Sequence, residues 1–333
     1  MRIRTWTYLA LVSATLAAAT ADTSARQGHY AKIADIPIGG AAAFDYLNVD
    51  SAAHRLYLTH GTEVVVIDTR TNAVVGRIPA GPRVHGIVIT PGNRAFITNG
   101  GDNSVSVVDL ATLTVVARVP AQANPDAITY DAARNAVYAF NHTGKSATVI
   151  DAKTNAVIAT IPLSGTAETG QVDAALGRVY VNIEDTSRVD VIDAVTHKVI
   201  ATWPVAPAEE PTGMAIDAAN HRLFVGGGAN VVMMDGRTGK VLSSLPICDG
   251  TDATWFDPSA SLVFSSCGGG AGAITVGRVS GTGLTASQTI ATAKGARTMA
   301  LDTMTHRLYV AGQNYGPSGA VPDSLHVLVF GTP

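Results

Sequence analysis

The sequence predicts an all-β protein, a seven-bladed β-propeller with four-stranded blades. The first observation behind this prediction is an internal repeat, an apolar run closed by one acidic residue, as in "VVVID". The closing residue recurs at intervals of 41, 42, 42 and 42 positions, at Asp68, Asp109, Asp151, Asp193 and Asp235. "AITVG" at Gly277 and "HVLVF" at Phe330 supply a sixth and a seventh copy. A period of about 40 residues built from strands is typical of propeller blades.

The second observation is that each copy divides into four short strands. In the second copy these are "HGIVIT", "RAFITN", "SVSVVD" and "TVVARVP", which are rich in β-branched residues and bounded by turn residues. No stretch keeps an amphipathic helical period. We therefore expect one domain over residues 22–333, preceded by a signal peptide at 1–21. The expected blades cover about 42–80, 84–120, 125–162, 167–205, 211–247, 251–293 and 296–331.

The two ends of the chain are expected to meet in the last blade. The seventh copy lacks a fourth strand, since the chain stops at "VFGTP". "YAKIADIPIGG", from Tyr30 to Gly40, matches the fourth strand of the first blade, Ala73–Gly81. We expect a strand at about 30–38 to complete blade 7, because a closed ring leaves no blade with an open edge.

The first residues are typical of an export signal. Arg2 and Arg4 precede a short apolar run, and "ATA" ending at Ala21 offers a cleavage site between small residues. The run is shorter than the ~20 residues that span a bilayer, so we expect no membrane span. Cleavage after Ala21 would place the protein in the periplasm or outside the cell.

The charge of the chain argues against nucleic acid as a partner. Without Arg2 and Arg4, 21 Lys and Arg stand against 26 Asp and Glu, a net charge of about −5, and no basic run interrupts the sequence. Charged residues make up 15% of the chain and hydrophobic residues 47%, which predicts strands buried on both faces. We expect a monomer.

Several recurrent polar residues are interpreted as architecture. The repeated Asp, followed three positions later by Thr in five copies, suits a turn in which the side chains bond backbone N–H groups. His54, His221 and His306 precede second strands at equivalent positions. Because they lie on separate blades around the ring, they are not expected to converge on one ion.

The most informative variation lies where the first strand of each blade begins. Six of the seven residues aligned there can ionise, where architecture alone favours small or apolar residues. In blade order they are Asp45, His85, Asp126, Glu168, Thr212, Asp252 and Arg297. First strands line the central channel, so these residues predict a polar, mostly acidic ligand site at one end of it. The alternative is that the charges are merely solvated.

Histidines in the loops after the second strands extend this site. His60 is expected to approach His85, and His142 to approach Glu168. A divalent metal is a candidate cofactor, with His60, His85 and Asp126 as possible ligands beside Asp45. Otherwise the site would hold a small molecule or a protein partner. No spacing in the sequence identifies a catalytic nucleophile.

The two cysteines, Cys248 and Cys267, both fall on connections of the sixth blade. In an oxidising compartment two such thiols are expected to form a disulfide, with free thiols or metal ligands as the alternatives.

The second strands, which read "RLYLTH", "RVYVNI" and "RLYVAG", and the unit "VVVIDTRTNAVVGRI" that follows the first of them, resemble the YVTN-repeat β-propellers, the YncE-like exported proteins of bacteria. The resemblance spans almost all of the chain after residue 21 and implies a binding or interaction scaffold. Related propellers also imply an alternative, a lactonase-like hydrolase or lyase. In it His60 or His85 would be the general base, and Arg297 or a metal would stabilise negative charge.

Overall fold

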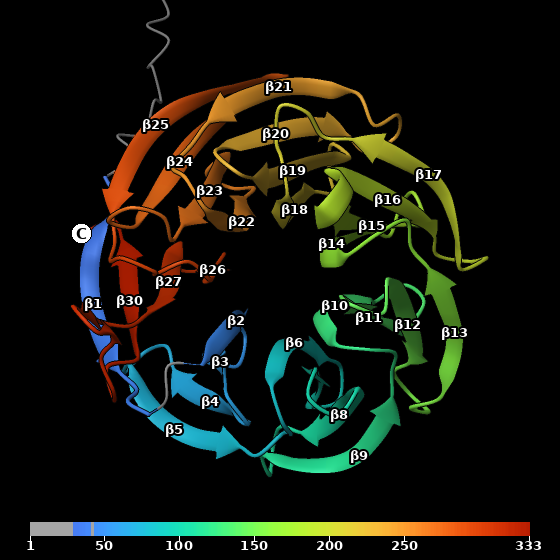
Figure 1. Cartoon of the computed structure of the whole chain (residues 1–333), viewed down its shortest axis with the longest axis horizontal. Helices are drawn as coiled ribbons and strands as arrows, with labels where there is room; N and C mark the ends of the chain where they lie inside the picture. The colour runs from blue at the N-terminus through green and yellow to red at the C-terminus, as the bar shows by residue number, and fades with distance from the viewer. Residues whose placement is uncertain (1–28, 41–42) are drawn as a thin grey trace, which may run out of the picture.

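The computed structural model of the chain describes residues 29–40 and 43–333. These residues form a ring of seven four-stranded antiparallel blades around a central channel (Figure 1), which confirms the predicted fold. The predicted signal peptide, at 1–21, lies outside the described residues. No helix in the part of the chain that the structure describes has the length and apolarity needed to cross a membrane.

The strands follow the chain order from the channel to the rim in the first six blades. Blade 1 contains β2 (Phe44–Asp50), β3 (Arg55–His60), β4 (Glu63–Asp68) and β5 (Ala73–Ile78). Blade 2 contains β6 (Val84–Thr90), β7 (Arg94–Asn99), β8 (Ser104–Asp109) and β9 (Thr114–Pro120). Blade 3 contains β10 (Pro125–Asp131), β11 (Ala136–Asn141), β12 (Ser146–Asp151) and β13 (Val157–Pro162).

The next three blades repeat this arrangement. Blade 4 contains β14 (Ala167–Asp173), β15 (Arg178–Ile183), β16 (Arg188–Asp193) and β17 (Lys198–Pro204), with a short 3₁₀ turn at Glu184–Thr186. Blade 5 contains β18 (Pro211–Asp217), β19 (Arg222–Gly227), β20 (Asn230–Asp235) and β21 (Val241–Pro246). Blade 6 contains β22 (Thr251–Asp257), β23 (Leu262–Cys267), β24 (Ala273–Ser280) and β25 (Gly283–Ala291).

Blade 7 joins the two ends of the chain. Its sheet order is β26 (Met299–Asp302), β27 (Arg307–Gly312), β30 (His326–Gly331) and β1 (Ala31–Pro37). A two-stranded hairpin, β28 (Tyr315–Gly316) and β29 (Gly319–Ala320), is inserted before β30. The pairing of β1 with β30 runs from Ala31 opposite Gly331 to Pro37 opposite His326. The predicted closure of the ring by the N-terminal strand is therefore confirmed.

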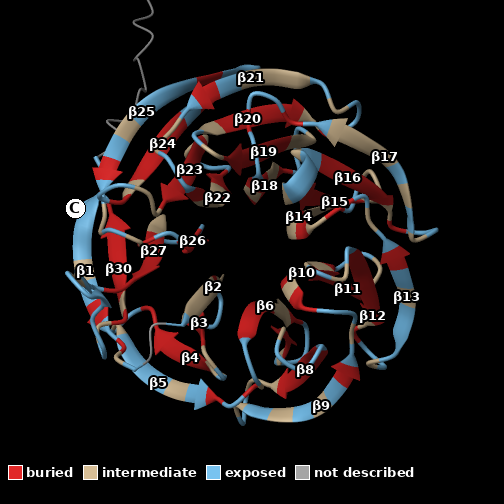
Figure 2. Ribbon diagram, in the orientation of Figure 1, coloured by how far each residue is buried: buried red, intermediate tan, exposed pale blue. Residues whose placement is uncertain are grey.

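The core lies in the middle strands of the blades (Figure 2). All six residues of β11 are buried, whereas four of the six residues of β13 at the rim are exposed. Adjacent blades share their apolar side chains: Tyr138 and Phe140 of blade 3 belong to one buried cluster with Val179 of blade 4. Strands buried on both faces explain the apolar composition of the chain.

The repeated acidic residues form turns, as predicted. Asp151 accepts hydrogen bonds from the backbone N–H groups of Lys153 at 2.9 Å and Thr154 at 2.7 Å. Asn155 follows in the left-handed region, with φ 63°. An Asn tolerates this backbone conformation better than most residues, which explains the recurrent turn sequence.

Two of the three equivalent histidines connect neighbouring blades. Nδ1 of His221 lies 2.6 Å from Oδ2 of Asp173, and Nδ1 of His306 lies 2.6 Å from Oδ2 of Asp257. In each pair the carboxylate belongs to the preceding blade and is buried. These histidines are structural and do not converge, as expected from their places around the ring.

Cys248 and Cys267 form a disulfide, with 5.7 Å between their Cα atoms. The bond ties the connection that follows β21 to the end of β23. The predicted pairing is confirmed, and such a bond fits an oxidising compartment.

Candidate ligand site at the channel mouth

A backbone irregularity presents the candidate residues to the channel. In blade 1, Phe44 pairs with His60 and Leu47 with Leu58, so β2 carries one extra residue at this point. The first strands of blades 2 to 6 have the same kind of β-bulge near their starts. A β-bulge turns a side chain away from the regular alternation of a strand. The bulges fall at Asp45, His85, Asp126, Glu168, Thr212 and Asp252.

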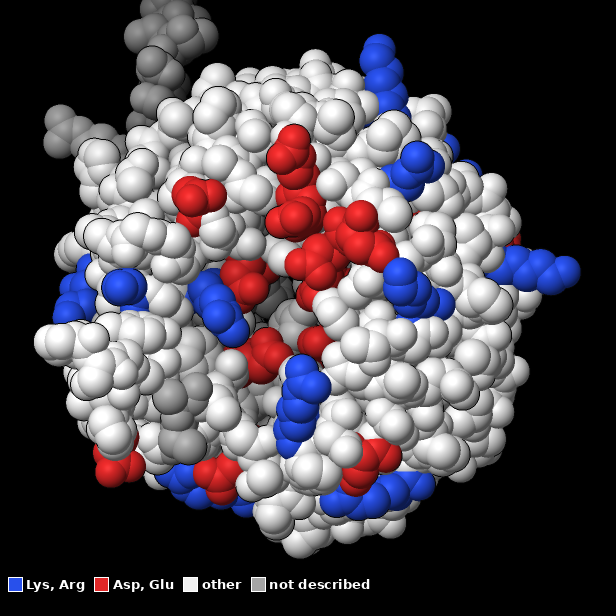
Figure 3. All heavy atoms as spheres, in the orientation of Figure 1, with Lys and Arg blue, Asp and Glu red and all other residues white. Residues whose placement is uncertain are grey.

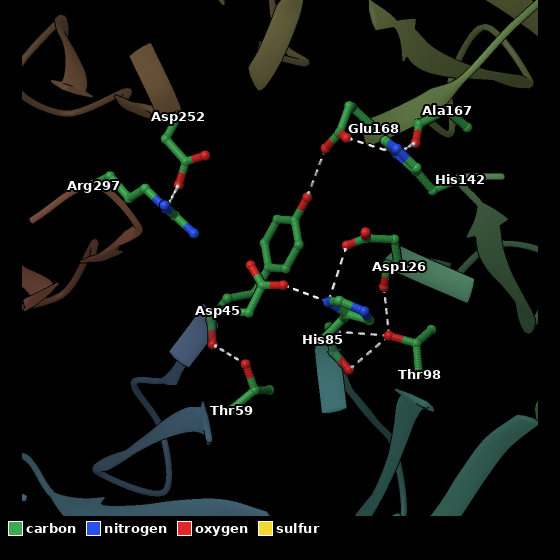
Figure 4. Close-up of polar contacts among 12 residues, drawn as sticks. Asp45, Thr59, His85, Thr98, Asp126, His142, Ala167, Glu168, Asp252 and Arg297 are labelled. Carbon is green, nitrogen blue, oxygen red and sulfur yellow. Dashed lines mark hydrogen bonds and ion pairs between the residues drawn. The ribbon is translucent and has the colours of Figure 1, made fainter. Parts of the chain in front are cut away.

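The first cluster joins blades 1, 2 and 3. Nδ1 of His85 lies 2.5 Å from Oδ2 of Asp45 and 3.7 Å from Oδ1 of Asp126 (Figure 4). Burial lowers the pKa of His85, but the hydrogen bond to Asp45 and the charges of Asp126 and Asp45 outweigh burial, so the pKa is raised. Asp126 is held in place through its own carbonyl, which accepts a hydrogen bond from the Thr98 hydroxyl.

The second cluster joins blades 3 and 4 and shares Asp126 with the first. Nδ1 of His142 lies 2.8 Å from Oε1 of Glu168 and 3.2 Å from the carbonyl oxygen of Ala167. The hydrogen bond to Glu168 is the main reason that the pKa of His142 is raised to about 9. The hydroxyl of Tyr46, from blade 1, donates to the other carboxylate oxygen of Glu168 at 3.4 Å.

A third group faces these clusters from blades 6 and 7. Nε of Arg297 lies 3.7 Å from Oδ2 of Asp252, and its guanidinium carbon lies 5.8 Å from the centre of the Phe44 ring. Arg297 is half exposed, so the pair is open to solvent on one side. We call the seven residues Asp45, His85, Asp126, His142, Glu168, Asp252 and Arg297 the mouth site.

The mouth site holds more carboxylates than its cations neutralise. Burial, together with the charge of Asp45, raises the pKa of Asp126 to about 8. Burial likewise raises the pKa of Asp252 to about 7, although Arg297 opposes the shift. The pKa of Glu184 is raised by burial and by Glu168. A carboxyl with a raised pKa is one whose negative charge is poorly stabilised where it stands.

The surface around the opening of the channel also carries more acidic than basic side chains (Figure 3). Figure 3, in the orientation of Figure 1, shows Asp and Glu atoms gathered around the central hollow, with few Lys and Arg atoms beside them. Below the opening the wall changes character. A cavity of about 190 Å³ is lined by Tyr46, Leu47, Ile87, Ile128 and Trp255 among others. A ligand would thus meet charged groups first and apolar groups deeper in the channel.

His60 does not join the histidine at position 85. It lies at the end of β3, 7% exposed, with its Nδ1 3.5 Å from Oε1 of Glu63 and its ring beside Gly40. In the described part of the chain, the clusters of three possible metal ligands are Asp45–His85–Asp126 and Asp126–His142–Glu168. Of the residues that the sequence suggested as metal ligands, Asp45, His85 and Asp126 fall together in one of these clusters, and His60 falls in neither.

Burial also bears on the general base expected for a hydrolase. His85 is 7% exposed, and its Nε2 is buried without a hydrogen-bond partner among the described residues. His60 is equally buried. Both histidines that the sequence suggested as a general base are therefore largely covered by other residues in this structure.

Sequence reasoning missed Tyr46 and Thr98, which connect and support the mouth site. Tyr46 is next to Asp45 in the bulge, where the strand departs from strict alternation. Burial raises its pKa well above the ordinary range, and Glu168 adds to the shift. A bulge leaves no mark in the residue pattern, and Thr98 is one of several buried residues of β7, so the sequence offered no signal for either residue.

Part of the chain is similar in sequence to known proteins, and the whole fold is similar to a solved structure. No family model matches the chain. It is 32% identical over 98 residues to the uncharacterised protein YncE of Salmonella typhimurium, and likewise to YncE of Salmonella typhi. Each match covers 28% of this chain and 28% of the relative, so well under two thirds of the relatives' length is spanned.

The structure is also similar to a chain in the crystal structure of the mitotic checkpoint complex. The TM-score is 0.76 and the identity 14%, with 98% of this chain and 99% of that chain covered. At so low a sequence identity, the similarity is evidence about the fold alone. It supports the ring of blades described above.

Proposed function

We propose, from the premise that the chain is a YncE-like β-propeller, that it is an exported binding protein whose mouth site holds a ligand with a cationic group. Propellers commonly present a binding site at one end of the channel, carried on loops and strand ends of a rigid ring. The signal-like pattern of the first residues and the disulfide support an exported, periplasmic or secreted protein.

The observation that carries the proposal is the poorly neutralised charge of Asp126 and Asp252. Both carboxyls are held in the channel wall by bulges, and their pKa values are raised to about 8 and about 7. A cation bound beside either carboxylate would supply opposite charge that its surroundings lack. The apolar wall below, with Tyr46 and Trp255, suits an uncharged portion of the same ligand.

The test compares cations and anions of similar size. Spermidine is expected to raise the melting temperature of the protein and to bind in calorimetry, whereas citrate is not. Asp126→Asn and Asp252→Asn should each weaken spermidine binding at least about fivefold, a coupling of about 1 kcal/mol. Asp109→Asn is the matched control, since it removes one negative charge from an exposed turn. Equal binding by all three variants would contradict the proposal.

A hydrolase or lyase is the second candidate. The pair of His142 with Glu168 favours it, because a carboxylate orients the ring and the histidine side chain is 26% exposed. This candidate predicts hydrolysis of simple γ- or δ-lactones that is lost in His142→Asn and kept in His197→Asn. Absence of any turnover by the unaltered protein would leave binding as the function.

A further inference from the structure

We infer that the cation held at the mouth site is a pair of first-row divalent transition-metal ions, bridged by the carboxylate of Asp126. The inference rests on the proposed function, since it names the cation that the mouth site would take. One ion would be held by Asp45, His85 and Asp126, and the other by Asp126, His142 and Glu168.

The geometry of the ligand atoms carries the first step. In each group, one ligand atom from each of the three residues lies within 4.8 Å of the other two. Ligands at about 2.0–2.2 Å from a tetrahedral ion stand roughly 3.5 Å apart. Each group therefore needs a small rearrangement, in which the hydrogen-bonded pairs His85–Asp45, at 2.5 Å, and His142–Glu168, at 2.8 Å, open around the ion. The two groups have Asp126 in common, and one carboxylate can give an oxygen to each of two ions.

The types of ligand limit which metals the mouth site would bind. Each group offers one imidazole nitrogen and two carboxylates. Imidazole favours zinc, iron, copper or nickel, whereas carboxylate, carbonyl and water sets favour magnesium, calcium or manganese. The mixed sets therefore fit zinc first and exclude neither iron nor manganese. Three protein ligands would leave each ion an open position toward the channel.

The surroundings of His85 provide an independent observation. Its Nδ1 faces the carboxylates, while Nε2 is buried and has no hydrogen-bond partner among the described residues. Oδ1 of Asn124 is also buried and unpartnered. A Cβ placed at Gly100 would lie 2.7 Å from Nε2 and 2.3 Å from that oxygen, so the two atoms border the same small space.

This arrangement places an unused acceptor near the ring nitrogen that a metal-binding histidine would use for support. When one ring nitrogen holds the ion, the other carries hydrogen and donates to a nearby acceptor, which orients the ring. A small rotation of the Asn124 amide would give Nε2–H of His85 that acceptor. The carbonyl of Ala167 lies near Nδ1 of His142 instead, at 3.2 Å, so the second ion would have to displace that contact.

The experiment titrates the chelator-treated mature protein, without a histidine tag, with zinc chloride and separately with manganese chloride in a calorimeter. Metal retained after dialysis is measured by mass spectrometry. We expect about two equivalents of one of the two metals for the unaltered protein. His85→Asn and His142→Asn should each keep about one equivalent, and Asp126→Asn should weaken both sites at least about tenfold.

The matched control is His197→Asn. His197 lies in an exposed turn with φ 53°, where Asn72 and Asn155 occupy the equivalent positions, and it should keep two equivalents. No retained metal, one equivalent in the unaltered protein, or full binding in Asp126→Asn would overturn the inference. If Asp126→Asn does not fold, judged by circular dichroism, the two histidine variants decide.

The outcome also separates this inference from the proposed function. If neither metal binds but spermidine binding still depends on Asp252, the mouth site takes organic cations and only the metal inference fails. If neither metal nor spermidine binds, both fail together.

Discussion

His85 and Asp45, which begin the first strands of adjacent blades, lie 2.5 Å apart between Nδ1 and Oδ2. The contact joins residues 40 positions apart in the chain. A similar contact at the other end of the blades joins His221 of blade 5 to Asp173 of blade 4. Paired histidines and carboxylates therefore connect neighbouring blades at both ends of the channel, and at the mouth a further carboxylate, that of Asp126, lies 3.7 Å from Nδ1 of His85.

The contact between His306 of blade 7 and Asp257 of blade 6 is expected to stabilise the ring. His306→Asn keeps a residue suited to the left-handed backbone, with φ 58°, but removes the contact to the buried Asp257. Since Asp257 keeps its bonds to Ser259 and Ala260, we expect a loss of about 1–2 kcal/mol in the free energy of unfolding by urea. His54→Asn is the control, because in blade 1 the partner of Asp302 is Ser51. If His306→Asn lowers the free energy of unfolding no more than His54→Asn does, the contact between His306 and Asp257 does not stabilise the protein.

The disulfide should stabilise the sixth blade. Cys248 and Cys267 close a loop with a sequence separation of 19, and a bond closing a loop of this size contributes about 3 kcal/mol in the chain-entropy account. Reductant is expected to lower the melting temperature of the unaltered protein by several degrees. The double variant Cys248→Ser with Cys267→Ser should have a lower melting temperature than the unaltered protein, and reductant should not change it. A melting temperature that reductant does not change in the unaltered protein would contradict this.

Closure by the N-terminal strand should be necessary for a monodisperse protein. A chain that begins at Gly39 loses β1 and with it the buried side chain of Ile36, which is 2% exposed. It also leaves the edge of β30 unpaired, and an open edge invites pairing with other chains. We expect aggregation in size-exclusion chromatography. A chain that begins at His29 keeps β1 and should elute as the full mature protein does.

Stability should depend on pH through Asp252. Its pKa is raised to about 7 in the folded protein, above the value of about 3.9 for an unperturbed Asp, so the folded state holds the proton more tightly. The resulting stabilisation is complete below about pH 4 and is lost as pH rises through about 7. Asn cannot ionise. We therefore expect Asp252→Asn to be more stable than the unaltered protein at pH 8, by about 1 kcal/mol, and to have a clearly smaller advantage at pH 5.

Thermal unfolding at the two pH values measures this difference. Asp109→Asn again serves as the control, because the carboxylate it replaces is exposed and bonds its own turn. The account is wrong if Asp252→Asn destabilises the protein equally at pH 5 and pH 8, since its carboxylate would then be stabilising when charged.

Most of the fold could be predicted from the sequence. The 42-residue period, the turn sequence after each "VID" run and the match of Tyr30–Gly40 to a fourth strand together determined the blades and their closure. These features are local or repeat at a regular interval, and such patterns can be read along a chain. The repeat also brought Asp45, His85, Asp126, Glu168, Asp252 and Arg297 into one aligned position.

Only the tertiary structure decided which of these residues touch. The bulges at the starts of the first strands turn Asp45 toward His85, while His60, predicted as the partner, remains beside Glu63. The sharing of Asp126 by two histidines and the bond from Tyr46 to Glu168 also depend on how adjacent blades are set against each other. Contacts between blades depend on side-chain packing and on backbone bulges. A repeating residue pattern contains no information about either. The contacts within the mouth site could therefore be found only from the tertiary structure.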